Sequence, residues 1–367
     1  MDYKRMPIEI ESPEQLGYST IKYNLTESSI SDTLFSSIQL NINDLKLCYG
    51  DHLGKSELRT LIASEFDGLT KENVLITAGA ASALFIVATS LLNKNDHLIV
   101  IRPNYASNIE TPRAIGCEID YVDLAFETGF SVSVDEIRSK IKSNTKLISI
   151  THPHNPTGMI ISQEMMMELA IVAEKNNCYL LVDETYRELN LRKRYPLGAS
   201  LHNRIISVAS VSKAYGLPGI RIGWLVTKDP VLFEKLLAAK EQIFVCNSVI
   251  DEEIAYQYLM KKTEYFKEIK THILRNRQTV MDWISAEGRM EMVEPEGGVV
   301  CFPRIKNTGT DLKKFYETLN TSYQTYVGPG HWFEMPKNYM RIGFGWPTNA
   351  ELKQGLKNIS LCLNDLG

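Results

Sequence analysis

Two ionisable residues stand at the ends of short apolar runs, where charged side chains are uncommon. Lys213 follows Ile205–Val208 in a loop rich in Ser and Gly, and Asp183 directly follows Tyr179–Val182. A poorly solvated lysine has a lowered pKa, so its free amine can attack a carbonyl carbon and form a Schiff base with a carbonyl cofactor. An unpaired buried carboxylate is costly, so Asp183 requires a cationic partner such as a protonated pyridine nitrogen. Taken singly, either residue is more simply explained by a structural ion pair.

A second group of residues could hold a phosphate. Gly79-Ala80-Ala81 stands where an apolar run turns into the helix expected over Ala81 to Leu92. Small residues leave backbone N–H groups open there, and a helix N-terminus favours an anion. Ser210 could add a hydroxyl donor and Arg221 a fixed positive charge. The alternative is a plain turn between a strand and a helix.

The elements that must position these residues alternate along the chain. Short apolar runs rich in β-branched residues are typical of strands buried on both faces. The runs are Val74–Ile76, Leu98–Ile101, Leu147–Ile150, Tyr179–Val182 and Ile205–Val208. Amphipathic stretches lie between them, and strands that alternate with helices predict a mostly parallel sheet covered on both faces. Ligands bind beyond the carboxyl ends of such strands, so the polar residues that follow the runs should meet at one edge.

We therefore predict an α/β fold with a large domain around a mostly parallel, seven-stranded type of sheet and a smaller α+β domain. The alternation ends near Ala255, Glu264 to Trp283 has helical character, and strand-like stretches follow at Gly298–Phe302 and Tyr339–Phe344. The predicted large domain covers residues 44–262 and the small domain 263–367. Residues 1–43 are too few for a core of their own. They could pack on either domain, and we assign them to the small one.

The composition excludes several classes of function. Among 367 residues, 40 Lys and Arg against 44 Asp and Glu leave a net charge of −4, with no general attraction to nucleic acid or anionic lipid. The longest apolar runs fall short of the ~20 residues of a membrane helix. Met1 to Arg5 leads into no apolar signal core, so we expect a cytoplasmic location. The six cysteines form no CxxC pair, and His152 and His154 lack a third ligand, so we predict neither a disulfide framework nor a metal site.

Considered together, these residues resemble those of the class I/II aminotransferases, which are fold type I enzymes that use pyridoxal 5′-phosphate. Asn155-Pro156-Thr157-Gly158 is similar to the NPTG turn of that family. Asp183 follows Asn155 by 28 positions, and Lys213 follows Asp183 by 30. Ser210-x-Ser212-Lys213, followed by Gly219-x-Arg221-x-Gly223-Trp224, resembles the lysine signature and is the most specific match. The resemblance covers nearly the whole chain.

The resemblance implies a role for each matching residue. Lys213 would form the Schiff base with the cofactor and then shuttle the proton, and Asp183 would keep the pyridine nitrogen protonated. Asn155 and Tyr186 would hydrogen-bond the phenolic oxygen, and Arg341 would hold the substrate α-carboxylate, with Asn155 beside it. The remaining cofactor contacts would be Tyr105, which stacks on the ring, and the phosphate ligands Ala80, Ala81, Ser210 and Arg221.

Tyr49 bears on the oligomeric state. Tyr49-Gly50, then Gly54 and Leu58-Arg59, resemble a family segment whose tyrosine reaches the phosphate in the neighbouring subunit. The resemblance therefore implies a homodimer with shared active sites. The alternative is a tyrosine buried in the core of its own domain.

The predicted function is transfer of an amino group from an α-amino acid to a 2-oxo acid by a ping-pong mechanism. A β-lyase, cyclase or oxidase on the same fold is the nearest alternative, since the same lysine, aspartate and arginine would serve it. A non-catalytic regulator that binds pyridoxal phosphate and a metabolite-binding protein without a cofactor are more distant alternatives. His331-Trp332-Phe333 departs from the small residues of many relatives and could either reshape the pocket mouth or fill the domain interface. Asn24 to Ser28 resembles a mobile segment that closes over substrate in relatives.

Overall fold

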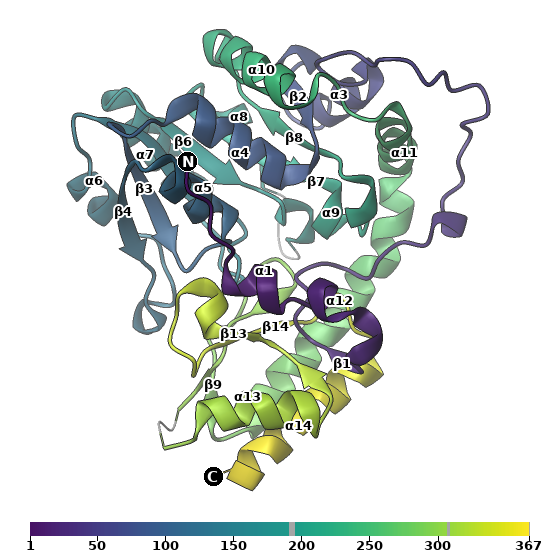
Figure 1. Ribbon diagram of the computed structural model, residues 1–367, viewed down its shortest axis with the longest axis vertical. Helices are drawn as coiled ribbons and strands as arrows, with labels where there is room; N and C mark the ends of the chain where they lie inside the picture. Colours follow the sequence, from purple (N-terminus) through teal and green to yellow (C-terminus); the bar gives the residue numbers. More distant parts are fainter. Residues whose placement is uncertain (191–194, 307–308, 367) are drawn as a thin grey trace.

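The polar residues that follow the apolar runs meet at one edge of a central sheet. In the computed structural model, which describes residues 1–190, 195–306 and 309–366, this sheet has seven strands and lies in the larger of two lobes (Figure 1). Its strand order is β2 (Val74–Thr77), β8 (Gly223–Val226), β7 (Ile205–Ser210), β6 (Tyr179–Asp183), β5 (Thr145–Thr151), β3 (His97–Arg102) and β4 (Glu118–Asp123). Only β8 runs antiparallel to its neighbours. The predicted α/β fold with a mostly parallel sheet is confirmed.

Helices cover both faces of this sheet, because the strands are apolar on both sides. Buried side chains of α6 (Val134–Ser139) and α7 (Gln163–Lys175) pack on one face. Those of α4 (Gly79–Leu91), α5 (Ser107–Ile115) and α10 (Pro230–Phe244) pack on the other. The remaining helices of the larger lobe are α3 (Ser56–Ala63), α8 (Gly198–Leu201), α9 (Val211–Ala214) and α11 (Val249–Met260).

The smaller lobe combines helices with short antiparallel strands. Its helices are α12 (Lys262–Ala286), α13 (Leu312–Thr321) and α14 (Asn349–Leu366). A three-stranded sheet orders β10 (Val300–Cys301), β14 (Met340–Gly343) and β13 (Gly328–Pro329), and β9 (Met290–Glu291) pairs with β11 (Arg304–Ile305). The long helix α12 leads from the larger lobe into the smaller one (Figure 1).

The chain begins on the larger lobe beside α5, and the two helices that follow lie between the lobes (Figure 1). There α1 (Pro7–Glu11) and α2 (Pro13–Leu16) precede β1 (Tyr23–Asn24), which pairs in parallel with β12 (Thr325–Tyr326) of the smaller lobe (Figure 1). Residues 30 and 33 bond to the loop after β7, so the segment contacts both lobes. The boundaries at residues 43 and 262 stay a prediction. Over the described residues, no helix is both long and apolar enough to cross a bilayer.

Candidate active site

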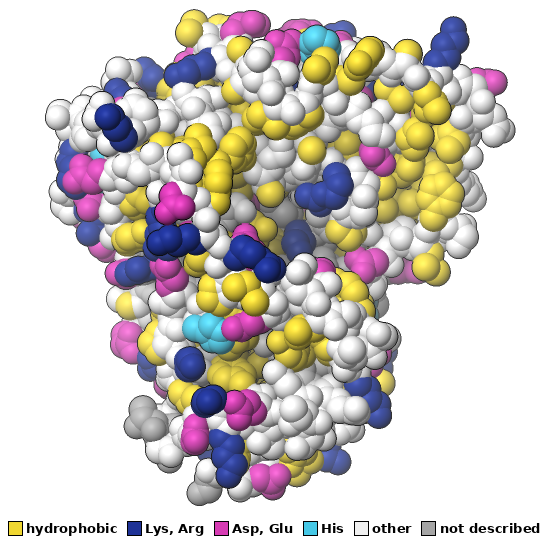
Figure 2. Space-filling model, viewed as in Figure 1, with side chains coloured by type: hydrophobic (Ala, Val, Ile, Leu, Met, Phe, Trp, Pro, Cys, Tyr) yellow, Lys and Arg dark blue, Asp and Glu magenta, His cyan; other side chains and the backbone are white. Residues whose placement is uncertain are grey.

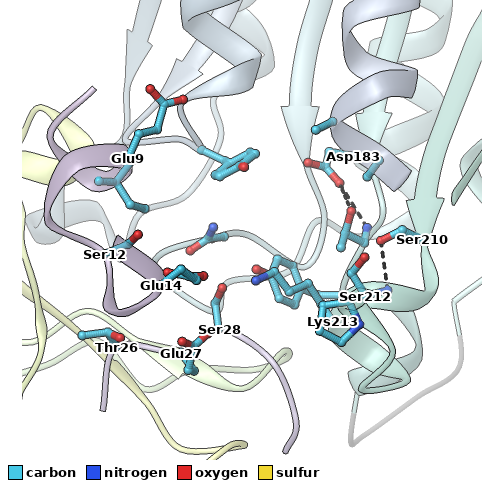
Figure 3. Close-up of a pocket in the computed structure, with 18 of the residues that line it drawn as sticks. Glu9, Ser12, Glu14, Thr26, Glu27, Ser28, Asp183, Ser210, Ser212 and Lys213 are labelled. Atoms are coloured by element: carbon cyan, nitrogen blue, oxygen red, sulfur yellow. Dashed lines mark hydrogen bonds between the residues drawn. The ribbon is translucent and has the colours of Figure 1, made fainter. Parts of the chain in front are cut away.

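A cavity of about 310 Å³ opens at the carboxyl edge of the sheet, between the two lobes. Every predicted site residue except Tyr49 lines it: Ala80, Ala81, Tyr105, Asn155, Asp183, Tyr186, Ser210, Lys213, Arg221 and Arg341. They come from the ends of five parallel strands, from the loop before β8, which supplies Arg221, and from β14, which explains why residues so far apart in the chain meet. The N-terminal segment closes the side of the cavity opposite Asp183 and Lys213 (Figure 3).

A cradle for an anion lies where β2 turns into α4. Gly79 adopts φ +81°, and a Cβ placed on it would lie 2.6 Å from Arg221 Nη2, so the guanidinium packs directly on the helix start. Arg221 itself adopts the left-handed φ of +49°, a conformation that costs a non-glycine residue about 1–3 kcal/mol. Its Nη1 donates to the Pro218 carbonyl at 3.0 Å, which holds the side chain in place. Helix N–H groups and this guanidinium together suit a phosphate dianion.

Asp183 is a buried carboxylate, 4% exposed, at the end of β6. Its Oδ1 accepts hydrogen bonds from the Thr185 amide (3.1 Å) and hydroxyl (2.6 Å), and its Oδ2 accepts one from Asn108 Nδ2 (3.4 Å). Burial raises the pKa of Asp183, and these donors act against the rise. No described cation pairs with it, so the site has a place for a cationic group of a ligand.

Lys213 projects from α9 into the cavity. Burial lowers the pKa of its amine, and the charge of Glu27 is the largest opposing cause. The Lys213 carbonyl accepts a hydrogen bond from the Ile30 amide at 3.2 Å, so the lysine loop and the N-terminal segment are joined. A lysine with a lowered pKa supplies the free amine that carbonyl chemistry requires.

Arg341 lies on β14, is 5% exposed and is held by two acceptors. Its Nη1 donates to Asn155 Oδ1 at 3.1 Å and its Nη2 to the Thr26 carbonyl at 2.7 Å. Its Nε is buried without a hydrogen-bond partner in the described part of the chain. Tyr186 lines the same wall, and burial raises the pKa of its hydroxyl. The arginine is thus oriented before any ligand arrives and keeps a donor free for a carboxylate.

Trp332 and the N-terminal segment close the cavity together. Trp332 is 2% exposed, lines the cavity and donates from Nε1 to Glu11 Oε2 at 2.7 Å. His331 Nε2 lies 2.8 Å from the same oxygen. Trp332 therefore both fills the space between the lobes and shapes the pocket, the two roles that the sequence left open.

Several lining or supporting residues were not predicted from the sequence. Asn108 supports Asp183 from α5, and no motif marks it. Thr185 stands two positions after Asp183, a spacing that could have indicated an Asx turn. The other unpredicted lining residues include Ile8, Glu9, Ser12, Pro13 and Glu14, while Thr26, Glu27, Ser28 and Trp332 belong to two segments that the sequence indicated near the substrate or the pocket mouth without a role for each residue.

The paired histidines lie outside the cavity lining. His154 Nε2 bonds the Pro103 carbonyl and its Nδ1 bonds the Thr157 hydroxyl, while His152 Nδ1 accepts from the Ile161 amide. Burial lowers the pKa of each imidazole to about 4, so both are neutral at pH 7 and serve the turn around Asn155. Within the described ranges, no three His, Cys, Asp or Glu residues group as metal ligands would.

Tyr49 lies apart from the cavity of its own chain and is 86% exposed. The alternative of a tyrosine buried in its own domain is therefore wrong. Apolar residues surround it on the surface, and they include Leu47, Val249 and Ile250.

With this geometry described, comparison with known proteins identifies the family. The aminotransferase class I and II family matches residues 29–359. The chain is 28% identical to capreomycidine synthase of Streptomyces vinaceus, over 94% of this chain and 90% of that protein. It is 30% identical to an aspartate aminotransferase of Pyrococcus horikoshii, over 86% and 83%. The solved structure of a PLP-dependent aminotransferase from Streptococcus suis superposes with a TM-score of 0.92 at 26% identity, covering 100% and 99% of the two chains.

The chain belongs to the aminotransferase class I and II family. It is a PLP-dependent aminotransferase. The cavity fits that cofactor on its own evidence, because the cradle at Gly79 suits a phosphate and Asp183 needs a cationic partner.

Proposed function

We propose that the protein catalyses a ping-pong transamination between an α-amino acid and a 2-oxo acid, in which each cavity residue has a separate binding or proton-transfer role. The observation that carries this assignment is the buried Asp183 carboxylate, without a cation, in the same cavity as Lys213 and Arg341. When bound, pyridoxal phosphate supplies an aldehyde carbon that takes up the amino group and a ring that withdraws electrons from the substrate Cα.

The larger lobe would hold the cofactor. Arg221, Ser210 and the amides of Ala80 and Ala81 would bind the phosphate, because they line the cradle at the start of α4. Asp183 would keep a proton on the pyridine nitrogen, with Asn108 and Thr185 fixing its two oxygens. Asn155 and Tyr186 would donate to the phenolic oxygen, and Tyr105 would stack on the ring.

Lys213 and Arg341 would act on the substrate. Lys213 Nζ would attach the cofactor in the resting enzyme and would then carry the proton away from the substrate Cα. Its lowered pKa supports this role, because a general base must be free of its proton near neutral pH. Arg341 would bind the α-carboxylate with the donor that Asn155 and Thr26 leave unused. This contact orients the Cα–H bond toward the lysine.

Incubation of the holoenzyme with an amino acid alone tests the assignment. We expect the visible band of the cofactor to disappear in a single half-turnover, to return on addition of a 2-oxo acid, and to be absent in Lys213→Ala. Continuous release of ammonia without a 2-oxo acid would instead identify a β-lyase. Cyclised product from the donor would identify a cyclase, the alternative that the likeness to capreomycidine synthase favours.

We also propose a homodimer in which Tyr49 reaches the cofactor phosphate of the second subunit. Large apolar side chains are exposed along the loop before α3 and beside α11, which include Leu34, Phe35, Leu47, Tyr49, Val245 and Ile250. Figure 2 shows apolar side chains gathered on the right-hand side of this view, where Figure 1 places that loop and α11. Burial of this surface against a second copy would remove it from water.

A hybrid dimer tests the shared site. Lys213→Ala and Tyr49→Ala homodimers are each impaired at both sites. If Tyr49 acts across the interface, the mixed dimer contains one site with both native residues, so activity returns after subunit exchange. If mixing restores nothing beyond the sum of the two parents, Tyr49 does not act in the neighbouring subunit.

A cytoplasmic location completes the proposal. The six cysteines are free thiols, the state that a reducing compartment maintains. Cell fractionation with an antibody to the native protein tests it, and recovery outside the cytosolic fraction would contradict it.

A further inference from the structure

Three carboxylates of the N-terminal segment line the cavity. Glu9 lies on α1, Glu14 on α2, and Glu27 follows β1. They stand on the side of the cavity opposite Asp183, Ser210 and Lys213 (Figure 3). Glu9 accepts a hydrogen bond from the Met6 amide at 2.8 Å, and Glu27 accepts one from the Tyr18 hydroxyl at 3.2 Å. Within the described ranges, none of the three pairs with a cation.

Glu27 is the most buried of the three, and its backbone is fixed to the smaller lobe. It is 8% exposed. Its segment is fixed to β14, because the Gly343 amide donates to the Leu25 carbonyl at 2.8 Å. The approach is so close that a Cβ on Gly343 would lie 1.8 Å from the Glu27 carbonyl oxygen. Since Arg341 is on the same strand, Glu27 is held beside the group that binds the substrate carboxylate.

The charges in the cavity leave Glu27 without a counter-ion. This argument rests on the proposed function, in which Arg221 binds the phosphate, Lys213 binds the aldehyde carbon of the cofactor and Arg341 binds the α-carboxylate. Asp183 would pair with the protonated ring nitrogen of the cofactor. A buried carboxylate is costly unless a cation joins it, and in the described part of the chain the Glu27 carboxylate accepts a hydrogen bond only from the neutral Tyr18 hydroxyl.

A second observation points to the same ligand. Arg341 Nε is buried and unpartnered, so this end of the cavity lacks an anion, while the N-terminal side lacks a cation. The field of the carboxylates reaches the reacting amine, because the charges of Glu27 and Glu14 both raise the pKa of Lys213. A molecule with a carboxylate at one end and a positive charge at the other complements both.

We infer that the amino donor has a cationic side chain, a guanidinium or an ammonium group, which Glu27 binds inside the cavity and Glu14 attracts at its mouth. Neutral side chains would leave the Glu27 carboxylate unpaired, and acidic ones would be repelled.

Matched pairs of donors test the inference on the holoenzyme. Arginine and citrulline share a shape but differ in charge, and norleucine lacks only the terminal ammonium of lysine. The rate of loss of the visible band, measured against donor concentration, gives kcat/KM for the half-reaction. We expect the cationic member of at least one pair to exceed its neutral counterpart by about 10- to 150-fold, the range of one charge-assisted hydrogen bond.

Variants separate charge recognition from a structural role. Glu27→Gln should reduce the ratio of cationic to neutral kcat/KM about tenfold or more, because its effect on the pKa of Lys213 is common to both donors and cancels in the ratio. Tyr18→Phe removes the hydrogen bond but keeps the carboxylate, so the ratio should persist. Glu317→Gln, the same change on the exposed face of α13, should alter neither rate.

Several results would overturn the inference. Equal rates for both members of each pair would do so, as would a Glu27→Gln variant that slows cationic and neutral donors alike. Neutral donors that react normally would leave the aminotransferase assignment intact. If no amino acid converts the band at all, the proposed function fails first, and the substrate class fails with it.

Discussion

Substitution of Gly79 by alanine should weaken binding of the cofactor phosphate without unfolding the protein. The added Cβ would lie 2.6 Å from Arg221 Nη2, closer than any stable contact, and the flexible guanidinium would give way. One charge-assisted hydrogen bond contributes about 1.5–3 kcal/mol, so its loss corresponds to an increase in Kd of about 10- to 150-fold. An alanine at position 79 would also have to adopt the left-handed φ of +81°, and this strain would lower the free energy of unfolding by about 1–2 kcal/mol.

Gly116→Ala is the matched control. Gly116 has φ +82°, and no atom lies within 4 Å of a Cβ placed there, so this variant has the same strain without the contact. Titration of each apoprotein with pyridoxal phosphate, followed by absorbance, gives Kd, and urea denaturation gives the free energy of unfolding. Both variants should lose similar stability, and only Gly79→Ala should lose affinity. A folded Gly79→Ala protein with the native Kd would refute the phosphate cradle.

Three further changes test other parts of the site. Asp183→Asn keeps the shape but not the charge, so the half-reaction should slow about 10²- to 10³-fold while the protein stays folded; an unchanged rate would contradict pairing with the ring nitrogen. Arg341→Lys should lower kcat/KM for the amino donor about 10- to 100-fold and leave the Kd of the cofactor unchanged; an equal loss of cofactor affinity would place the arginine elsewhere. Burial raises the pKa of Glu184 to about 7, so the folded state keeps a proton that the unfolded state releases above about pH 4.5, and stability falls as the pH rises toward 7. Urea denaturation at pH 5 and pH 8 gives the free energy of unfolding of Glu184→Gln and of the native protein. The difference between them should change in favour of Glu184→Gln as the pH rises, by at most about 3 kcal/mol, and a constant difference would contradict the raised pKa of Glu184.

The central strands and their order along the chain were predictable because they are buried on both faces. β6 and β7 consist largely of apolar residues, and the catalytic candidates Asp183 and Lys213 stand at the end of β6 and three residues after β7. β4, with the sequence Glu-Ile-Asp-Tyr-Val-Asp, was missed because it is an edge strand that is half exposed and alternates in polarity. The short β8 was missed because it has only four residues and its first two, Gly223 and Trp224, belong to the lysine signature.

The cofactor side of the cavity and Arg341 on the substrate side were predictable, whereas the individual contacts of the N-terminal segment were not. Lys213 and Asp183 follow strands at a recognisable spacing, so local sequence marks them. Glu14 and Glu27 have no such spacing, because tertiary contacts position them: Glu11 meets Trp332, and the Leu25 carbonyl meets Gly343. A single sequence contains no local pattern for contacts between residues more than 300 positions apart.

The two halves of the cavity come from different stretches of the chain. In the proposed function, residues 80 to 221 would surround the cofactor, while residues 8 to 28 and 332 to 341 would surround the substrate. Mutations near the two termini can therefore alter which donor is accepted while the central stretch preserves the chemistry. Related chains that diverge in this way can acquire new donors without rebuilding the machinery that moves the amino group.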